Sequence, residues 1–273
     1  MKHTLINTDC LDYLSRSNVG HWTTIFADPP DNIDTKYGSY KDKIHDDSYR
    51  NLLCEWLYLF VKIADTVWFS YNSKWSFDVG TIVAKMIRGR DDIKVKSCVQ
   101  VFTFGQHSHH DLGNNHRPLL RIRRRDAPLR PDAIRIPSVR QENGDKRADP
   151  RGRVPGDVFD FPRVTGNSEQ RRPWHPTQLN EGLVERCVRL TTPEGESVLD
   201  PFAGTGTTLR VCKRTDNPCT LIELDASYCA KIAEEHEDIE RRCPQCGSPL
   251  IVTSDKWLCC ENGCGRLVTR GVV

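Results

Sequence analysis

SVLDPFAGTGTT, residues 197–208, joins an apolar run to a stretch with helical spacing through a turn that contains two glycines. Gly204 and Gly206 allow the backbone to turn sharply and to approach a ligand closely. The free N–H groups at the start of the following helix favour an anionic or polar ligand group. The next predicted strand, 219–225, ends in Glu223 and Asp225. Glu223 lies 17 positions beyond Gly206 (223 − 206), close to the separation at which an acid binds a ribose.

This pattern predicts a nucleoside-containing ligand at the turn. Glycines in such a turn can also serve packing alone, and a dinucleotide would satisfy the same spacing. The Gly-Lys-Ser/Thr ending of a triphosphate-binding loop is missing from 197–208, which argues against a nucleotide triphosphatase.

Strands and helices alternate on both sides of this turn. Period-2 or continuous apolar runs predict strands, and apolar residues at helical spacing predict helices. The predicted strands include 23–30, 66–72, 94–104 and 219–225, and the predicted helices include 48–64, 76–89, 177–190 and 226–242. Strands that alternate with helices predict an α/β fold with a mostly parallel sheet covered on both faces.

A second motif, Asp28-Pro29-Pro30, stands where the strand 23–30 must end, because proline cannot donate to a sheet ladder. In open α/β sheets the carboxyl ends of the strands form the ligand-binding edge. The Asp28 carboxylate and the Pro29 carbonyl can both accept hydrogen bonds from an exocyclic amine. The competing interpretation is an ordinary Pro-Pro turn with a solvated aspartate.

Together the two motifs resemble those of the N6-adenine/N4-cytosine DNA methyltransferase family. Asp28-Pro29-Pro30 resembles the family's catalytic motif, and 200–206 resembles its cofactor-binding motif. The order, catalytic motif first, resembles the beta group of that family. His175-Pro-Thr177 is similar to the family's segment over the methionine part of the cofactor, and 7–10 resembles its early acidic segment.

The resemblance implies a Rossmann-like S-adenosylmethionine-dependent methyltransferase fold and a DNA base flipped out of the duplex as acceptor. It implies that Asp28, Pro29, Pro30 and Asp31 form the catalytic segment. The cofactor-binding residues that it implies are Asp9, Cys10, Asp28, His175, Thr177, Asp200, Phe202, Ala203, Gly204, Thr205, Gly206, Thr207, Glu223 and Leu224.

An aspartate at position 28 favours the N6 amine of adenine over the N4 amine of cytosine by this resemblance. Three alternatives stay open, namely an N4-cytosine enzyme, an RNA methyltransferase, and a DNA-binding relative that has lost catalysis. The family usually has a base-stacking aromatic residue where this chain has Asp31. Tyr37, Tyr40, Trp68 or Phe69 could supply the missing ring face, or Asp31 could hydrogen-bond the edge of the base.

The middle of the chain, 105–172, lacks sustained periodicity and is predicted to be an irregular basic insertion that reads the target DNA. Between 117 and 172 there are 15 Lys and Arg against 8 Asp and Glu, a surplus of seven positive charges. Such a surplus suits a polyanion. The residues expected near DNA are Tyr37, Arg121, Arg123, Arg124 and Arg125.

Five of the 12 cysteines crowd between 243 and 264. Cys243-Pro-Gln-Cys246 followed by Cys260 and Cys264 predicts a closed four-thiolate Zn²⁺ site in a small ribbon, a structural site and not a catalytic one. Cys259 is the spare or alternate ligand, and a tail of disulfides or unpaired thiols is the competing interpretation.

The predicted organisation has four parts: 1–104, the catalytic half; 105–172, the insertion; 173–240, the cofactor-binding half; and 241–273, the zinc ribbon. The sequence has no apolar run of about 18 residues, so no membrane span is expected. No charged-then-apolar signal pattern opens the chain, so a cytoplasmic location is expected. The expected assembly is a monomer or a homodimer.

Overall fold

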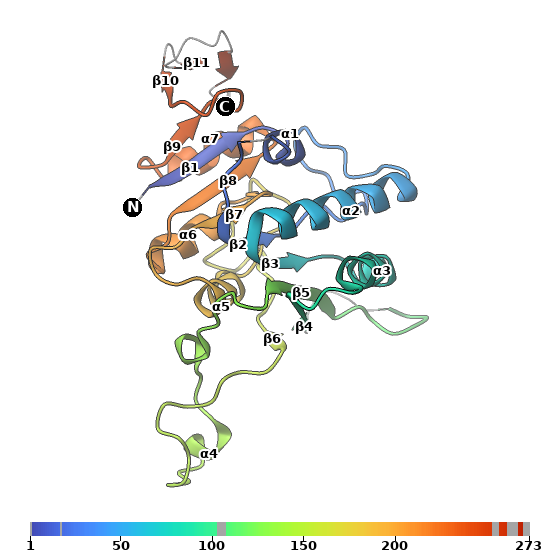
Figure 1. The fold of residues 1–273 in the computed structure, drawn as a ribbon, viewed down its shortest axis with the longest axis vertical. Coiled ribbons are helices and arrows are strands. Elements are labelled where there is room, and N and C mark those ends of the chain that lie inside the picture. The colour runs from blue at the N-terminus through green and yellow to red at the C-terminus, as the bar shows by residue number, and fades with distance from the viewer. Residues whose placement is uncertain (1, 17, 103–107, 253–256, 261–266, 270–273) are drawn as a thin grey trace.

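A computed structural model describes residues 2–16, 18–102, 108–252, 257–260 and 267–269. Its main body is a nine-stranded sheet in the order β6-β4-β5-β3-β2-β7-β8-β1-β9 (Figure 1). The strands of this sheet are β1 (His3–Asn7), β2 (Trp22–Ala27), β3 (Ala64–Ser70), β4 (Ile93–Val101), β5 (His116–Arg124), β6 (Val158–Asp160), β7 (Val198–Asp200), β8 (Cys219–Glu223) and β9 (Glu240–Arg242).

Helices connect these strands and cover the sheet. They are α1 (Cys10–Leu14), α2 (Asp46–Ile63), α3 (Ser76–Ile87), α4 (Val139–Glu142), α5 (Glu181–Thr191), α6 (Thr207–Arg214) and α7 (Ala226–Glu235), with 3-10 turns at Ser73–Trp75 and Pro131–Ile134. No helix among the described residues is long and apolar enough to cross a membrane.

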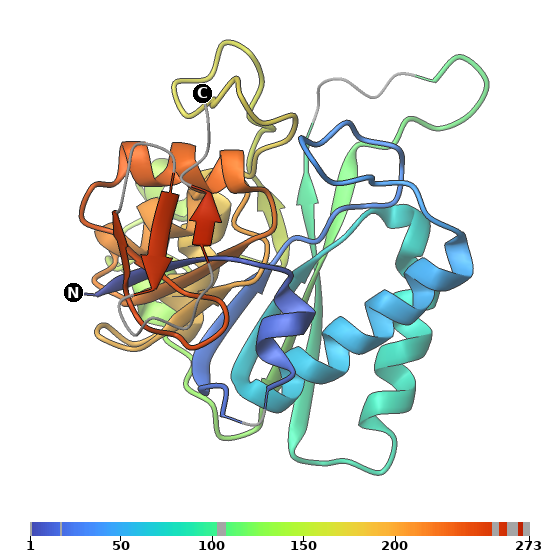
Figure 2. The same ribbon diagram turned by 90° about the horizontal axis from the view of Figure 1, so that it is seen from above.

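The central strands are buried on both faces, as their near-continuous apolar sequences predict. In β2 the side chains alternate: Ile25 packs with the α2 and α3 layer, and Phe26 packs with the α5 and α6 layer. In β3, Val67 likewise packs with the α2 and α3 layer and Trp68 with the α5 and α6 layer. The result is a three-layer molecule with a helical layer on each side of the sheet (Figures 1 and 2).

The sheet is mostly parallel, as predicted, with β5 antiparallel to both of its neighbours. This strand corrects the prediction that 105–172 is an irregular insertion. The segment supplies β5 between β3 and β4, and it supplies β6 at the edge beside β4. Between β5 and β6 the chain extends away from the sheet as an arm that carries α4 (Figure 1).

The end of the chain also differs from prediction. The helix predicted over 226–242 ends at Glu235, and Glu240–Arg242 forms β9, which pairs in parallel with β1. The tail then forms a small antiparallel sheet of β10 (Leu250–Val252), β11 (Trp257–Cys260) and β12 (Leu267–Thr269).

Candidate active site

A cavity of about 480 Å³ opens at the carboxyl ends of β2, β7 and β8. Asp28 at the end of β2 and Asp200 at the end of β7 both line it, although they are 172 positions apart in the chain (200 − 28). Parallel strands bring their carboxyl ends to one edge, which is why the two sequence motifs meet.

Most of the predicted site residues line this cavity. They are Asp9, Cys10, Asp28, Pro29, Pro30, Asp31, Tyr37, His175, Thr177, Asp200, Phe202, Ala203, Gly204, Thr205, Thr207, Glu223 and Leu224. Gly206 does not line the cavity. It caps α6 with a φ of 71°, and a Cβ there would meet Ile232 at 3.4 Å, so its role is conformational.

The buried carboxylate of Asp200 stabilises the glycine turn through hydrogen bonds. Its carboxylate accepts a hydrogen bond from the Phe202 N–H at 2.9 Å and another from the Thr208 hydroxyl at 2.5 Å. Burial raises the pKa of Asp200 to about 7, against the lowering effect of these two hydrogen bonds. Gly204 has a φ of 51°, and a Cβ on it would lie 3.4 Å from His175 Nε2, so the turn and the His175 segment are in close contact.

Glu223 lies at the end of β8 beside the glycine turn. Its two carboxylate oxygens accept hydrogen bonds from the N–H groups of Gly204 and Asp225, each at 2.8 Å. Burial raises the pKa of Glu223 to about 7. Each oxygen keeps a further lone pair, so the carboxylate can accept from the two hydroxyls of a ribose.

The Asp28-Pro29-Pro30-Asp31 segment is fixed through its backbone. The Tyr49 hydroxyl donates to the Pro30 carbonyl at 2.6 Å, and the Trp75 indole N–H donates to the Asp31 carbonyl at 2.8 Å. The Pro29 carbonyl receives no hydrogen bond from the described part of the chain and is available to an amine.

Arg117 on β5 completes this end of the cavity. Its Nη2 donates to Asp28 Oδ1 at 2.7 Å. Its Nη1 and Nη2 also donate to the two carboxylate oxygens of Asp31, at 2.7 and 3.0 Å. Its Nε donates to the Ser70 hydroxyl at 2.7 Å. Burial raises the pKa of Asp28 above its ordinary value, and Arg117 opposes that rise. Burial alone would lower the pKa of Arg117, but the two carboxylates outweigh it and raise that pKa.

In the sequence, Arg117 does not stand out from the other arginines of the basic stretch. The signal that identifies it is spatial. Because β5 runs antiparallel to β3, with Ser70 opposite Leu119, the beginning of β5 lies at the ligand-binding edge. Nothing in the local sequence specifies that register.

The same orientation places the four arginines expected near DNA elsewhere. Arg123 stands opposite Thr66, toward the amino end of β3 and away from the cavity. Its Nη1 donates to the carbonyls of Arg124, Arg125 and Ala127 at 2.8–3.1 Å. The guanidinium of Arg121 lies over the Trp68 ring, 5.7 Å from its centroid. The structure therefore does not bring Arg121, Arg123, Arg124 and Arg125 to the cavity.

The loop that follows Asp28-Pro29-Pro30-Asp31 docks on α7 and its N-cap residue Asp225. The Ser39 N–H and hydroxyl donate to Asp225 at 2.6 and 2.8 Å, and the Gly38 N–H donates to the Tyr228 hydroxyl at 2.9 Å. Burial would raise the pKa of Asp225, but hydrogen bonds from Ser227, Ser39 and Tyr228 outweigh it and lower that pKa to about 2. The docked loop forms a wall of the cavity.

Tyr37 and His175 meet at this wall, with ring centroids 5.6 Å apart. His175 Nδ1 donates a short hydrogen bond to the Thr177 carbonyl, and burial lowers the pKa of His175 to about 4. The ring is therefore neutral at pH 7 and offers an apolar face and one ring nitrogen to the cavity.

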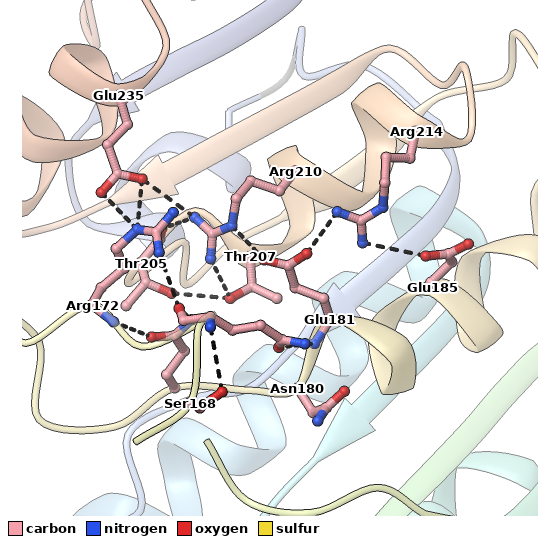
Figure 3. Close-up of polar contacts among 12 residues, drawn as sticks. Ser168, Arg172, Asn180, Glu181, Glu185, Thr205, Thr207, Arg210, Arg214 and Glu235 are labelled. Atoms are coloured by element: carbon pink, nitrogen blue, oxygen red, sulfur yellow. Dashed lines mark hydrogen bonds and ion pairs between the residues drawn. The ribbon is translucent and has the colours of Figure 1, made fainter. Parts of the chain in front are cut away.

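An ion-pair network holds the segment before His175 and the glycine turn together (Figure 3). Arg210 on α6 donates to the Thr205 carbonyl and to Glu181, each at 2.7 Å. Arg172 pairs with Glu235 of α7 at 2.8 Å, and Arg210 lies 3.8 Å from the same carboxylate. One chain of charges thus links α5, α6 and α7 to two walls of the cavity.

Of the predicted zinc ligands, Cys243 and Cys246 do not line this cavity. Cys243 is buried and Cys246 is exposed, and the Gly247 N–H donates to the Cys243 carbonyl at 2.9 Å in a tight turn, with a Gly247 φ of 73°. Such a turn suits a Cys-x₂-Cys knuckle. Cys264 and the side chain of Cys260 lie outside the described residues, and within those residues no metal-binding cluster is present.

Comparison with known proteins assigns the chain to a family. The sequence profile of the DNA methylase family matches residues 23–235 of the 273. The chain belongs to this family of DNA methylases.

Two characterised relatives align along most of the chain. Type II methyltransferase M.HpaI of Haemophilus parainfluenzae is 26% identical over 246 residues, which are 88% of this chain and 76% of that protein. DNA adenine methyltransferase YhdJ of Escherichia coli (strain K12) is 27% identical over 241 residues, 82% of this chain and 79% of that protein.

Two solved structures share the fold. The cytosine-N4-specific PvuII DNA methyltransferase matches with a TM-score of 0.65 at 12% identity, over 86% of this chain and 87% of that one. The complex of M1.HpyAVI with SAM matches with a TM-score of 0.53 at 16% identity, over 85% of this chain and 99% of that one.

Proposed function

We propose that this DNA methylase transfers a methyl group from S-adenosylmethionine to an exocyclic amine of a base in DNA, with adenine N6 as the favoured acceptor. The single observation that carries the proposal is the shared cavity. The glycine turn with Glu223 lines one part of it, and Asp28 with Pro29 lines another. A cofactor held at the turn and an amine held at Asp28 would therefore occupy the same cavity.

The residues present fit S-adenosylmethionine. Glu223 can accept from the ribose hydroxyls, Leu224 offers an apolar surface beside it, and the N-cap carboxylate of Asp9 borders the same space. The neutral ring of His175 suits the neighbourhood of a cationic sulfonium better than a protonated histidine would. A fold neighbour, M1.HpyAVI, was solved with SAM bound. When bound, the cofactor supplies an electrophilic methyl group.

The residues at the end of β2 can prepare the acceptor. An amine that donates one N–H to Asp28 and the other to the Pro29 carbonyl is fixed in place, and its lone pair points away from both acceptors. Positioning of this kind accounts for a large part of the barrier reduction in group transfer. As the nitrogen gains a methyl group it loses one proton, which the Asp28 carboxylate is placed to accept.

The choice of adenine rests on Asp28 at the first motif position and on the adenine-specific relative YhdJ. Cytosine N4 is the second candidate, because a fold neighbour, the PvuII enzyme, is cytosine-N4-specific. Both bases present an amine next to a ring nitrogen, so the same two acceptors can hold either one.

Expression in a host without DNA methylation, followed by long-read mapping of modified bases, tests the proposal. N6-methyladenine in a recurrent sequence is the expected result, and N4-methylcytosine would select the second candidate. Asp28→Ala should abolish modification and leave cofactor binding, measured by calorimetry, within about threefold of the unmodified protein. Asp91→Ala, which removes a carboxylate that is 88% exposed, is the matched control. No modified base in cells that contain folded, DNA-binding protein would refute the enzyme proposal.

A further inference from the structure

Asp28, Asp31 and Arg117 form a triad of charges at one end of the cavity. One terminal nitrogen of Arg117, Nη2, donates to both acids, to Asp28 Oδ1 at 2.7 Å and to Asp31 Oδ1 at 3.0 Å. The two carboxylates are therefore close enough to repel each other, and neither side chain is more than 26% exposed. Two like charges in such surroundings are both ionised only when a cation compensates them. Arg117 is that cation, and the triad keeps one net negative charge.

Arg117 is held in place by contacts that the protein alone provides. The two oxygens of Asp31 accept from Nη1 at 2.7 Å and from Nη2 at 3.0 Å, which is a bidentate fork. The Arg117 Nε donates to the Ser70 hydroxyl at the end of β3 at 2.7 Å. These bonds fix the plane of the guanidinium, so the remaining bond to Asp28 Oδ1 fixes the orientation of the Asp28 carboxylate.

The backbone around Asp31 is fixed as well. The Trp75 indole N–H donates to the Asp31 carbonyl at 2.8 Å, and Asp42 accepts from the Asn32 N–H at 2.9 Å. Asn32 has a φ of 57°, in the left-handed region, and it is buried. Such a conformation of a non-glycine residue persists only where its surroundings determine it strongly. The fold therefore holds the Asp31 carboxylate at one place beside Asp28.

We propose that Arg117 and Asp31 are positioning residues for Asp28: Arg117 keeps the Asp28 carboxylate ionised and in one orientation, and Asp31 holds Arg117 there. This inference rests on the proposed function. An ionised carboxylate carries no proton and can only accept, which is what the amine of the acceptor base requires. The inference also explains why a carboxylate can stand at position 31, where the family pattern has an aromatic ring. Arg117 compensates its charge, so the site keeps the single negative charge that Asp28 alone would give.

The neighbours of Asp28 act on its ionisation in opposite directions. Burial raises the pKa of Asp28, Arg117 lowers it, Asp31 raises it to a smaller extent, and the Ser70 hydroxyl lowers it. After burial, the guanidinium has the largest effect on this pKa. Removal of Arg117 and removal of Asp31 should therefore change the ionisation of Asp28 with opposite signs.

Asp200 and Tyr37 are the other titratable groups of the cavity that interact with Asp28. Burial raises the pKa of Asp200, at the end of β7, to about 7. Burial also raises the pKa of Tyr37, in the loop that follows Asp31, so this phenol is neutral throughout the range in which a carboxyl group titrates. Neither side chain forms a hydrogen bond with Arg117 or Asp31 in the part of the chain that the structure describes. Substitutions at positions 117 and 31 should therefore act first on Asp28.

The test is the pH dependence of the single-turnover rate of methylation. It uses excess protein, saturating S-adenosylmethionine and a duplex that contains the recognition sequence found by mapping. At saturation the profile reports groups of the assembled complex, and the pH dependence of cofactor binding does not enter. The proteins compared are the unmodified chain, Arg117→Met, Asp31→Asn and the double variant. Arg90→Met, which removes a surface arginine paired with Asp92, is the control and should leave the profile unchanged.

The midpoint of the acid limb should move in opposite directions in the two single variants. Arg117→Met leaves two adjacent carboxylates without their cation, so the midpoint should rise by about one pH unit or more. Asp31→Asn removes the like charge and keeps the guanidinium, so the midpoint should fall. In the double variant the midpoint should lie between those of Arg117→Met and the unmodified protein. At pH 7 the double variant should therefore methylate faster than Arg117→Met, a rescue that the loss of a merely structural contact would not give.

An acid limb of Arg117→Met that coincides with that of the unmodified protein would overturn the inference, and so would a double variant slower than Arg117→Met at pH 7. Calorimetry with S-adenosylmethionine shows whether each variant is folded. If Arg117→Met binds no cofactor, Asp31→Asn decides alone, and a midpoint at or above that of the unmodified protein rejects the inference. An unmodified protein that methylates no base would instead refute the proposed function itself.

Discussion

Gly38 lies against the carboxylate of Asp225 so closely that a Cβ at position 38 would overlap Asp225 Oδ2. Gly38 belongs to the loop that follows the catalytic segment, and Asp225 caps α7 next to the predicted ribose-binding acid Glu223. The acceptor and cofactor parts of the cavity are therefore joined by direct contact of loop and helix cap.

Gly38→Ala should displace the loop from Asp225 and weaken the two hydrogen bonds from Ser39. Hydrogen bonds to a charged group contribute about 1.5–3 kcal/mol each, so the Kd for the cofactor should rise by about tenfold or more. Calorimetry with S-adenosylmethionine measures this change. Gly80→Ala is the control, because no atom lies within 4 Å of a Cβ there and Gly80 is in helix α3. That variant should gain about 0.5–1 kcal/mol of stability and bind normally. Normal binding by Gly38→Ala would contradict the coupling.

Glu223 should make cofactor binding depend on pH. Its pKa is raised to about 7 by burial, and only the ionised form accepts from both ribose hydroxyls. We expect the Kd to rise as the pH falls below about 7, approaching a tenfold change per pH unit, and to flatten above pH 8. In Glu223→Gln the Kd should be high and nearly independent of pH. A pH profile of Glu223→Gln parallel to that of the unmodified protein would assign the dependence to another group.

The same carboxyl has the opposite effect on the stability of the cofactor-free protein. Because the folded-state pKa lies above the ordinary value of 4.5, the protonated acid favours folding, and this contribution is lost as the pH rises from about 4.5 through about 7. Glutamine does not titrate, so the Tm of the unmodified protein should fall relative to that of Glu223→Gln over that window. Differential scanning fluorimetry at several pH values measures it.

Arg210 should matter more for stability than its neighbour Arg214. Arg210 is 11% exposed and bonds the Thr205 carbonyl and Glu181, whereas the side chain of Arg214 is 44% exposed at the outer end of the network. Arg210→Met leaves a buried carboxylate short of a partner and should lower the free energy of unfolding by about 2–4 kcal/mol. Arg214→Met should cost about 1 kcal/mol or less. Urea denaturation of both variants decides the order, and equal losses would show that burial does not set the contribution.

The cysteine tail should carry zinc. We expect about one Zn²⁺ per chain by elemental analysis, and loss of that metal in the double variant Cys243→Ser with Cys246→Ser. Cys54→Ser, in helix α2, is the control and should keep it. Because a four-thiolate site has no open position, metal removal should lower the stability of the tail and leave the methyl-transfer step itself unaffected. Metal-free protein from zinc-supplemented cells would refute the ligand assignment.

The layered fold and the meeting of the two motifs were predictable because they follow from local patterns. Strand-length apolar runs, helical periodicity and the rule that ligands bind at the carboxyl ends of parallel strands bring Asp28 and Asp200 to one edge. Strand β5 was missed because its nine residues include four arginines and a proline, which leave only Leu119, Leu120 and Ile122 as an apolar signal. The guanidinium of Arg121 lies over the Trp68 ring, so a charged side chain covers apolar surface at a position that a hydrophobicity pattern assigns to solvent.

The contacts of Arg117 were beyond sequence reasoning for a different reason. They depend on the register between β3 and β5, which pairs residues about 50 positions apart (119 − 70 = 49). That register also turns Arg123 back onto backbone carbonyls at the other end of the strand. Charge content alone could not separate an arginine that lines the cavity from arginines that bond to the backbone elsewhere.

The pairing of β1 with β8 has a consequence for biosynthesis. His3 stands opposite Cys219, which follows it by 216 positions in the chain (219 − 3). Strand β2 likewise pairs with β7, which comes much later in the sequence. At roughly 5–20 residues per second, on the order of 10–40 s pass between translation of the first strand and that of its partner. For that interval β1 lacks both of its native neighbours and β2 is paired on one edge only, with β3. The nascent chain should therefore depend on ribosome-associated chaperones, and its yield should fall when synthesis is faster than their binding.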